Sequence, residues 1–395
     1  MSRILVSGIG LISSIGTSKE ENHLSLKSGI CGMRKPEFLE TIHASRLVFG
    51  EVKLSTPQLK ELLKASEKGI TRTTLLALKA FEEALLDSKI NPEQHSDRST
   101  AFINASTVGG MSQTDEMYHD ANSQSGGSEF IGTYDFASSA VYIQERYKLQ
   151  GLVNTINTAC SSSANAIMYG ARLIKQGKAK RAIVGGTDSL SKFTVNGFNS
   201  LGILSPEFCK PFDETRKGLN LGEGAAYLVL EKEEDCAGKT IYAEVSGYCN
   251  SNDSFHASSL SETGEGPYLA MKGALETAGL KAADIDFINA HGTATENNDL
   301  VESRAMMRIF DKVPPFLSTK ANTGHTLGAA GAIEAVYSIL SLYHNELYPA
   351  LNFNTPINET KLIPVKRYEQ KNIRHVLSNS FGFGGNCTSL VFSKA

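Results

Sequence analysis

The sequence lacks three features that would assign it to specialised classes of protein. It has no Cys-x-x-Cys pair among its six cysteines, which indicates neither a zinc knuckle nor a disulfide framework, so we expect a reducing compartment, the cytoplasm. It has no apolar run long enough to span a membrane. It has no excess of basic residues, and its formal net charge of -3 argues against a general nucleic-acid-binding protein.

The start of the chain also lacks the pattern of a signal peptide. The apolar stretch 4–15 follows Arg3, but glycines and serines interrupt it and no small-x-small cleavage pattern follows. We therefore expect a buried strand followed by a loop. Gly8, Gly10 and Gly16 imitate a dinucleotide-binding loop, but their spacing is not G-x-G-x-x-G, so we expect no nucleotide site.

What is present is an ordinary globular composition over 395 residues, with 41% hydrophobic and 21% charged residues. This length exceeds what a single core usually serves. Predicted strands alternate with predicted helices, which favours an α/β protein with layered sheets and helices. The order of elements restarts after the charged stretch 231–239. We therefore predict an internal duplication, with an N-terminal half at 1–240 and a C-terminal half at 241–395.

The predicted elements of each half follow from apolar periodicity and from glycine-rich boundaries. In the first half we expect strands at 3–10, 100–106, 152–156, 181–186 and 222–230, a helix at 60–86, a long loop with some helix at 107–132 and a polar loop up to residue 216. In the second half we expect strands at 241–247, 285–290, 316–319, 376–377 and 389–392, and helices at 267–278 and 328–343.

One cysteine lies in a pattern typical of a nucleophile. Cys160 follows the predicted strand 152–156 and precedes a predicted helix, on a tight turn whose serines are good N-cap residues. The positive end of a helix stabilises a thiolate, which favours a nucleophilic role. The same pattern also fits a small buried cysteine, so Cys160 alone leaves both interpretations open.

Two histidines occupy the same kind of turn in the second half. His291 follows a predicted strand and begins a segment dense in hydrogen-bonding residues, and His325 follows another strand, with Lys320 just before it. In α/β sheets such turns gather at one end of the strands, where sites form. The spacing of the cysteines and histidines offers no pair of metal ligands, so we expect no metal.

With these stretches in view, the sequence resembles the β-ketoacyl-acyl carrier protein synthases, in their elongating, type II-like branch. Four motifs occur in the family's order along essentially the whole chain. They are Thr158-Ala159-Cys160-Ser161-Ser162, Ala290-His291-Gly292-Thr293-Ala294-Thr295, Lys320-Ala321-Asn322-Thr323-Gly324-His325 and Phe381-Gly382-Phe383-Gly384-Gly385. The resemblance implies a thiolase-like fold, a duplicated five-layer α/β/α/β/α arrangement that forms dimers.

The resemblance also assigns roles to residues. Cys160 would hold the acyl chain, while His291 and His325 would stabilise the enolate formed when malonyl-carrier protein loses carbon dioxide. Lys320 would hold the histidine turn together with Glu334. The remaining expected substrate contacts are Thr293 and Thr295 on the pantetheine arm, and Phe381 and Phe383 in the closing glycine loop, with the backbone N–H groups of Cys160 and Phe383 forming an oxyanion hole.

The partner that the resemblance implies is an acyl carrier protein, whose phosphopantetheine leaves no need for a separate cofactor. Because carrier proteins are acidic, we expect a basic patch to receive them, with Lys64, Lys68, Arg72 and Lys210 as candidates. We expect a homodimer, or alternatively the catalytic subunit of a heterodimer with a non-catalytic chain-length partner.

Two departures from the family's usual motifs bear on the pathway. Asn386-Cys387 replaces the usual Thr-Asn after the closing glycines, and Ala321 replaces a serine after Lys320. Such variants fit specialised polyene or polyketide synthases as well as fatty-acid elongation. A thiolase, which would want a second cysteine in the closing loop, and a cysteine hydrolase are the weaker alternatives.

Overall fold

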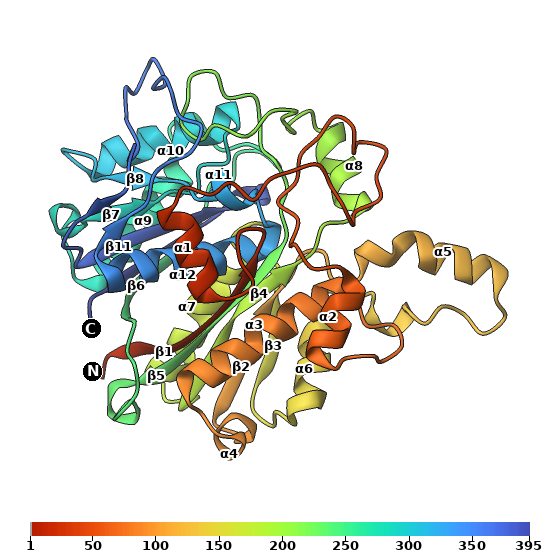
Figure 1. Ribbon diagram of the computed structural model, residues 1–395. Helices are drawn as coiled ribbons and strands as arrows, with labels where there is room; N and C mark the ends of the chain where they lie inside the picture. The colour runs from red at the N-terminus through yellow and green to blue at the C-terminus, as the bar shows by residue number, and fades with distance from the viewer. Residues whose placement is uncertain (1) are drawn as a thin grey trace.

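The computed structural model describes residues 2–395, and its strands build one large mixed sheet (Figure 1). Within these residues the sheet has ten strands in the order β3-β2-β4-β5-β1-β6-β12-β11-β7-β8. The first half contributes β1 (Ile4–Ser13), β2 (Thr100–Ala105), β3 (Val153–Ile156), β4 (Arg181–Asp188) and β5 (Gly224–Lys232). The second half contributes β6 (Ala243–Asn252), β7 (Phe287–Asn289), β8 (Phe316–Leu317), β11 (His375–Phe381) and β12 (Asn386–Ser393).

The two halves of the sheet repeat one topology. The first half runs β3-β2-β4-β5-β1, and the second, read from its own edge, runs β8-β7-β11-β12-β6. In each half the three strands nearest the edge are parallel and the two inner strands are antiparallel to their neighbours. The halves join through a short antiparallel contact in which Leu5 and Val6 pair with Glu244 and Ala243. This repetition is the internal duplication predicted from the order of the elements.

Helices cover both faces of each half-sheet, giving five layers. Helices α7 (Ser162–Lys175) and α12 (Ala330–His344) contact each other and strands of both halves, so they form the central layer. The outer layers contain α3 (Arg72–Ser88) on the first half and α9 (Glu265–Ala278) with α10 (Glu296–Ile309) on the second. The remaining elements are α1 (Lys19–Lys27), α2 (Thr56–Leu63), α4 (Pro92–Ser96), α5 (Thr114–Ser123), α6 (Ser138–Tyr147), α8 (Lys192–Ser200), α11 (Lys320–Thr323), β9 (Glu346–Leu347) and β10 (Glu369–Gln370).

Small residues set the spacing between these layers. A Cβ on Gly10 of β1 would lie 1.9 Å from the carbonyl oxygen of Ala80 in α3, so only glycine admits this close approach. Gly10 therefore belongs to a strand packed under a helix. In the central layer, a Cβ on Gly331 of α12 would lie 2.7 Å from the backbone nitrogen of Ala164 in α7.

The structure corrects two predicted elements. The predicted helix 60–86 is two helices, because Lys64 adopts a left-handed conformation that ends α2 and Thr71 caps the start of α3. The polar loop predicted up to residue 216 contains α8, which Ser191 caps. None of the helices within residues 2–395 combines the length and apolar character needed to cross a membrane.

One candidate for the basic patch is not at the surface. The Arg72 guanidinium lies in the interior and donates to the Glu223 carboxylate through Nε at 3.0 Å and Nη2 at 2.6 Å. The same carboxylate accepts the backbone N–H groups of Val52 and Leu190 at 3.0 and 3.1 Å. Placing Arg72 in a carrier-binding patch is therefore wrong. Its charge is neutralised in a buried ion pair with Glu223, which also holds the segments of Val52 and Leu190 through their backbone N–H groups.

Removing one member of this pair should destabilise the fold. Arg72→Leu leaves the Glu223 carboxylate buried without its cation, so we expect the free energy of unfolding to fall by about 3–5 kcal/mol. Chemical denaturation measures this loss, and Lys68→Leu, at an exposed position of the same segment, is the control. A loss for Arg72→Leu no larger than the control's would contradict the structural role of the pair.

Candidate active site

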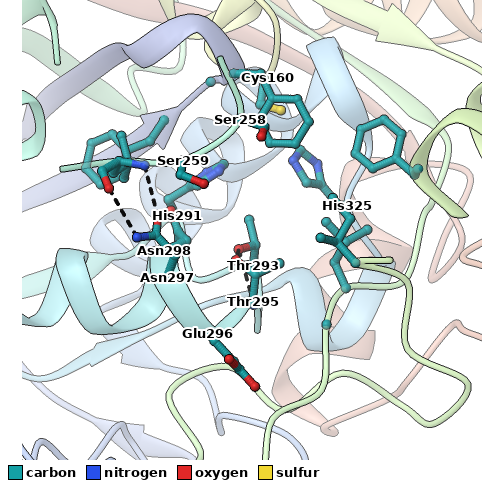
Figure 2. A pocket seen from close by; sticks show the side chains of 18 of the residues that line it. Cys160, Ser258, Ser259, His291, Thr293, Thr295, Glu296, Asn297, Asn298 and His325 are labelled. Atoms are coloured by element: carbon teal, nitrogen blue, oxygen red, sulfur yellow. Dashed lines mark hydrogen bonds between the residues drawn. The ribbon is translucent and has the colours of Figure 1, made fainter. Parts of the chain in front are cut away.

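Four turns meet at one cavity of about 370 Å³, and together they carry the residues predicted from the motifs (Figure 2). Cys160 lies between β3 and α7, His291 follows β7, His325 follows α11, and Phe383 follows β11. All four line the cavity. The cysteine comes from the first half of the chain and the histidines from the second, so the duplication creates the site where its two halves meet.

The cysteine turn is tight and strained. Ala159, just before Cys160, has a φ of 53°, a left-handed conformation that costs free energy for a residue with a Cβ. Ser161 occupies the N-cap position of α7, as predicted, but its side chain makes no capping bond. Its hydroxyl lies 2.8 Å from the carbonyl oxygen of Thr158 and 2.7 Å from Oδ1 of Asn386, which brings the glycine loop to the cysteine turn.

The Cys160 thiol is buried, with 7% of its surface exposed. Burial raises the pKa of Cys160 to about 11, while the Lys320 cation and the backbone N–H of Phe383 oppose this rise. Burial thus favours the neutral thiol and opposes the stabilisation of a thiolate expected from the start of the helix, because apolar surroundings disfavour the charged form. Reaction at this sulfur must therefore include the departure of a proton.

A buried ammonium group orients His291. Lys320 Nζ lies 2.6 Å from the carbonyl oxygen of His291 and 3.2 Å from its Nδ1, and it also bonds to the Glu334 carboxylate. An ammonium group has three N–H donors and no acceptor, so these three acceptors satisfy it fully. Nδ1 of His291 must then accept, and the ring proton of the neutral imidazole lies on Nε2.

A backbone group gives His325 the same tautomer. The N–H of Leu327 donates to Nδ1 of His325 at 3.1 Å, so here too Nδ1 accepts and Nε2 carries the proton. The two rings stand nearly perpendicular, with centroids 5.5 Å apart. The pKa of both histidines lies well below 6.5, mainly because the rings are buried and also because the Lys320 cation is close to them. Two neutral imidazoles thus direct N–H donors toward one cavity.

The expected substrate contacts border the same space. Thr293 and Thr295 line the cavity with their hydroxyls 2.9 Å apart, and Figure 2 places them on the side away from Cys160. Phe381 packs against the His291 ring with centroids 5.6 Å apart. Phe383 stacks on Phe198 of α8 at 5.7 Å. Glu334 reaches the site only through Lys320 and is not among the residues lining the cavity.

Sequence reasoning missed the acidic residues that hold the histidine segment. Both oxygens of the buried Glu302 carboxylate accept backbone N–H groups, from His291 and Gly292, each at 2.9 Å. Asp299 accepts from the backbone of Ala294 at 3.1 Å and of Phe212 at 2.7 Å. Their spacing of three along α10 places them on one helix face, but that face could be recognised only once residues 296–309 were known to be helical.

The other candidates for the basic patch are at the surface. Lys64 and Lys68 are exposed, whereas Lys210 is half-buried and lies 3.2 Å from Glu207. Glu207 also pairs with Lys217 at 2.8 Å, and Lys217 lines the cavity. Glu207 therefore partly neutralises Lys210 and Lys217, of which Lys217 lines the cavity.

Lys320→Met should change the electrostatics of the site in a defined direction. Losing this cation removes a cause that lowers the pKa of Cys160, so the thiolate fraction should fall and alkylation should slow, by about tenfold for each unit of pKa. The assay is alkylation by iodoacetamide at pH 8, followed by intact mass. Lys239→Met, which removes a cation paired with Glu231 on β5, is the control. An unchanged rate in Lys320→Met would contradict the coupling.

Comparison with known proteins gives one consistent result. The β-ketoacyl synthase N-terminal domain matches residues 1–236 and the corresponding C-terminal domain matches residues 242–354. The chain is 36% identical to 3-oxoacyl-[acyl-carrier-protein] synthase 2 of Rhizobium meliloti, covering 100% of this chain and 99% of the relative.

Solved structures agree. The ishigamide ketosynthase/chain length factor superposes with a TM-score of 0.93 at 27% identity, covering 100% of this chain and 99% of that one. A ketosynthase in complex with its chain length factor from Xenorhabdus doucetiae gives 0.88 at 30% identity, covering 100% and 98%. The predicted thiolase-like fold is thereby confirmed, and the chain belongs to the β-ketoacyl synthase family.

Proposed function

We propose that this enzyme condenses malonyl-acyl carrier protein with an acyl chain held on Cys160, forming a carbon–carbon bond. The observation that carries the proposal is the cavity in which one buried thiol faces two neutral imidazoles, each with its proton on Nε2. A pair of N–H donors of this kind suits an enolate oxygen. The carrier protein's phosphopantetheine supplies the thioester, so the reaction needs no separate cofactor.

The first half-reaction is a thioester exchange. The Cys160 sulfur attacks the acyl carbonyl carbon, the bond from that carbon to the pantetheine sulfur breaks, and the thiol proton ends on the departing pantetheine. The backbone N–H groups of Cys160 and Phe383 would stabilise the tetrahedral oxyanion. The acyl chain would lie against the apolar part of the cavity wall, which includes Phe198, Ile203 and Leu219.

The second half-reaction begins with malonyl-carrier protein. Its carboxylate leaves as carbon dioxide, and the bonding electron pair passes into an enolate whose oxygen accepts the Nε2–H groups of His291 and His325. The enolate carbon then attacks the acyl carbonyl, the bond from that carbon to the Cys160 sulfur breaks, and the released thiolate takes up a proton from solvent. Thr293 and Thr295 would bind the pantetheine arm between the surface and the histidines.

We further propose that the enzyme works in the cytoplasm as a dimer formed at the edge of the first half-sheet. Strand β3 ends the sheet there and is only half-buried. Apolar side chains beside it are exposed: Leu152 by 45% and Val141 of α6 by 46%. An unpaired strand edge with exposed apolar neighbours favours pairing with another chain. All six cysteines are free thiols, which fits a reducing compartment.

A second candidate is the catalytic subunit of a heterodimer with a non-catalytic chain-length partner. The high TM-score to the ishigamide ketosynthase/chain length factor favours it.

The thiolase alternative is weaker. Cys387 is buried, its thiol contacts the carbonyl oxygen of Gly385, and it is not among the residues that line the cavity.

The mass of the purified chain in solution distinguishes the two assemblies. Light scattering should give twice the mass of the chain, and Val141→Glu with Leu152→Glu should give the monomer, because burying two carboxylates at the interface is unfavourable. Ile363→Glu, at an exposed position outside α6 and β3, is the control. A wild-type chain that remains monomeric until a chain-length partner is added would contradict the homodimer and favour the heterodimer.

The two half-reactions separate the roles of cysteine and histidines. Cys160→Ala should abolish condensation while carbon dioxide release from malonyl-carrier protein continues. His291→Ala and His325→Ala should each slow that release by roughly a hundredfold or more, the usual effect of losing one oxyanion donor. The measurements are carbon dioxide release and the mass of the acyl-enzyme. Normal condensation by Cys160→Ala, or wild-type decarboxylation by the histidine variants, would overturn the assignment.

A further inference from the structure

The interior contains a carboxylate that the mechanism above does not use. Asp188 ends β4, is fully buried, and accepts a ring of hydrogen bonds. The donors are Ser106 Oγ at 2.8 Å, Thr107 N at 2.9 Å, Thr107 Oγ1 at 2.6 Å, Val108 N at 2.9 Å and Gly328 N at 2.7 Å. An ionised carboxylate, which only accepts, satisfies such a ring completely.

One of these donors, the N–H of Gly328, belongs to the turn that follows His325. Gly328 follows Leu327, whose own N–H donates to Nδ1 of His325. Leu327 has a φ of 54°, a left-handed conformation that a branched side chain adopts only when its surroundings impose it. The Asp188–Gly328 bond fixes the peptide immediately after this strained residue. The Leu327 N–H that donates to His325 belongs to the peptide on the other side of the same strained residue.

The packing around this bond leaves little freedom for an alternative. A Cβ added to Gly328 would lie 2.8 Å from Oδ2 of Asp188 and 2.9 Å from Cγ2 of Thr107. Leu327 itself is buried in the apolar cluster that contains Val108 and Leu190. The turn is thus clamped between the carboxylate and an apolar wall.

We propose that Asp188 is a positioning residue for decarboxylation, because its bond to Gly328 keeps the proton of His325 on Nε2. Without that bond the strained turn relaxes and the Leu327 N–H moves away from Nδ1. The neutral ring can then carry its proton on Nδ1, and Nε2 no longer donates to the enolate. This inference rests on the proposed function for its catalytic consequence, but the tautomer itself can be observed without substrate.

The first measurement is ¹⁵N NMR of the histidine rings in the intact enzyme, with His325→Gln identifying the His325 signals. The wild type should show the His325 proton on Nε2, and Asp188→Asn should show a mixture of tautomers. The signals of His291, which Lys320 orients, should stay unchanged. A His325 ring that remains entirely Nε2–H in Asp188→Asn would overturn the inference, whatever the enzyme's activity.

The second measurement compares the two half-reactions. Asp188→Asn should lower carbon dioxide release from malonyl-carrier protein by about tenfold or more, while the rate of Cys160 acylation changes by less than about threefold. Gly328→Ala keeps the carboxylate but forces the contact apart, so it should act in the same direction even if Asp188→Asn folds poorly. Glu231→Gln, a buried carboxylate of β5 that bonds to Ser7 and Arg181, controls for the loss of buried charge.

The outcomes distinguish this inference from the proposed function. Equal losses in both half-reactions for Asp188→Asn and Gly328→Ala would reduce Asp188 to a purely structural residue. A wild-type enzyme that neither acylates Cys160 nor releases carbon dioxide would refute the proposed function, and the NMR measurement would still decide whether Asp188 sets the tautomer.

Discussion

The site depends on one buried cation whose three donors are all satisfied. Lys320 lies in the interior, where an unpaired charge would be strongly unfavourable, and Glu334 and two atoms of His291 compensate it. The same cation acts on the surrounding groups. It helps to keep both imidazoles neutral and opposes the effect of burial on the cysteine. A single charge, held deep in the second half of the chain, therefore acts on the protonation of residues from both halves, in addition to the larger effect of burial.

The sequence predicted the parts of the fold that have strong local signals. Apolar strands bounded by glycines, and the helix that follows Cys160, lie where periodicity placed them, because burial on both faces requires continuous apolar runs. The single helix predicted over 60–86 was wrong because a left-handed Lys64 ends α2, and the break before α3 also contains Gly69, whose φ is 72°. Helix α10 was missed because its first turn, Glu296 to Asp299, is entirely polar and reads as a loop.

The candidate site, like the fold, was predicted only in part. Cys160, His291, His325 and Lys320 could be named from motifs; the structure brings the cysteine and both histidines to one cavity and places Lys320 behind it, against His291. Their tautomers could not be predicted, because they depend on contacts between segments distant in sequence. Arg72 illustrates the opposite error. Charge suggests a surface residue, and only the position of Glu223, 151 residues away, reveals that Arg72 is internal.

The contact of the two central helices at Gly331 has a consequence for how such an enzyme can diversify. Helix α7 begins beside Cys160, and α12 follows the turn that carries His325. The distance between these two helices therefore sets the distance between the nucleophile and this histidine. The apolar wall that would receive the acyl chain lies instead on α8 and neighbouring loops. Substitutions in that wall can alter which acyl chains are accepted without changing the spacing of α7 and α12. Selectivity and chemistry can therefore change independently of each other.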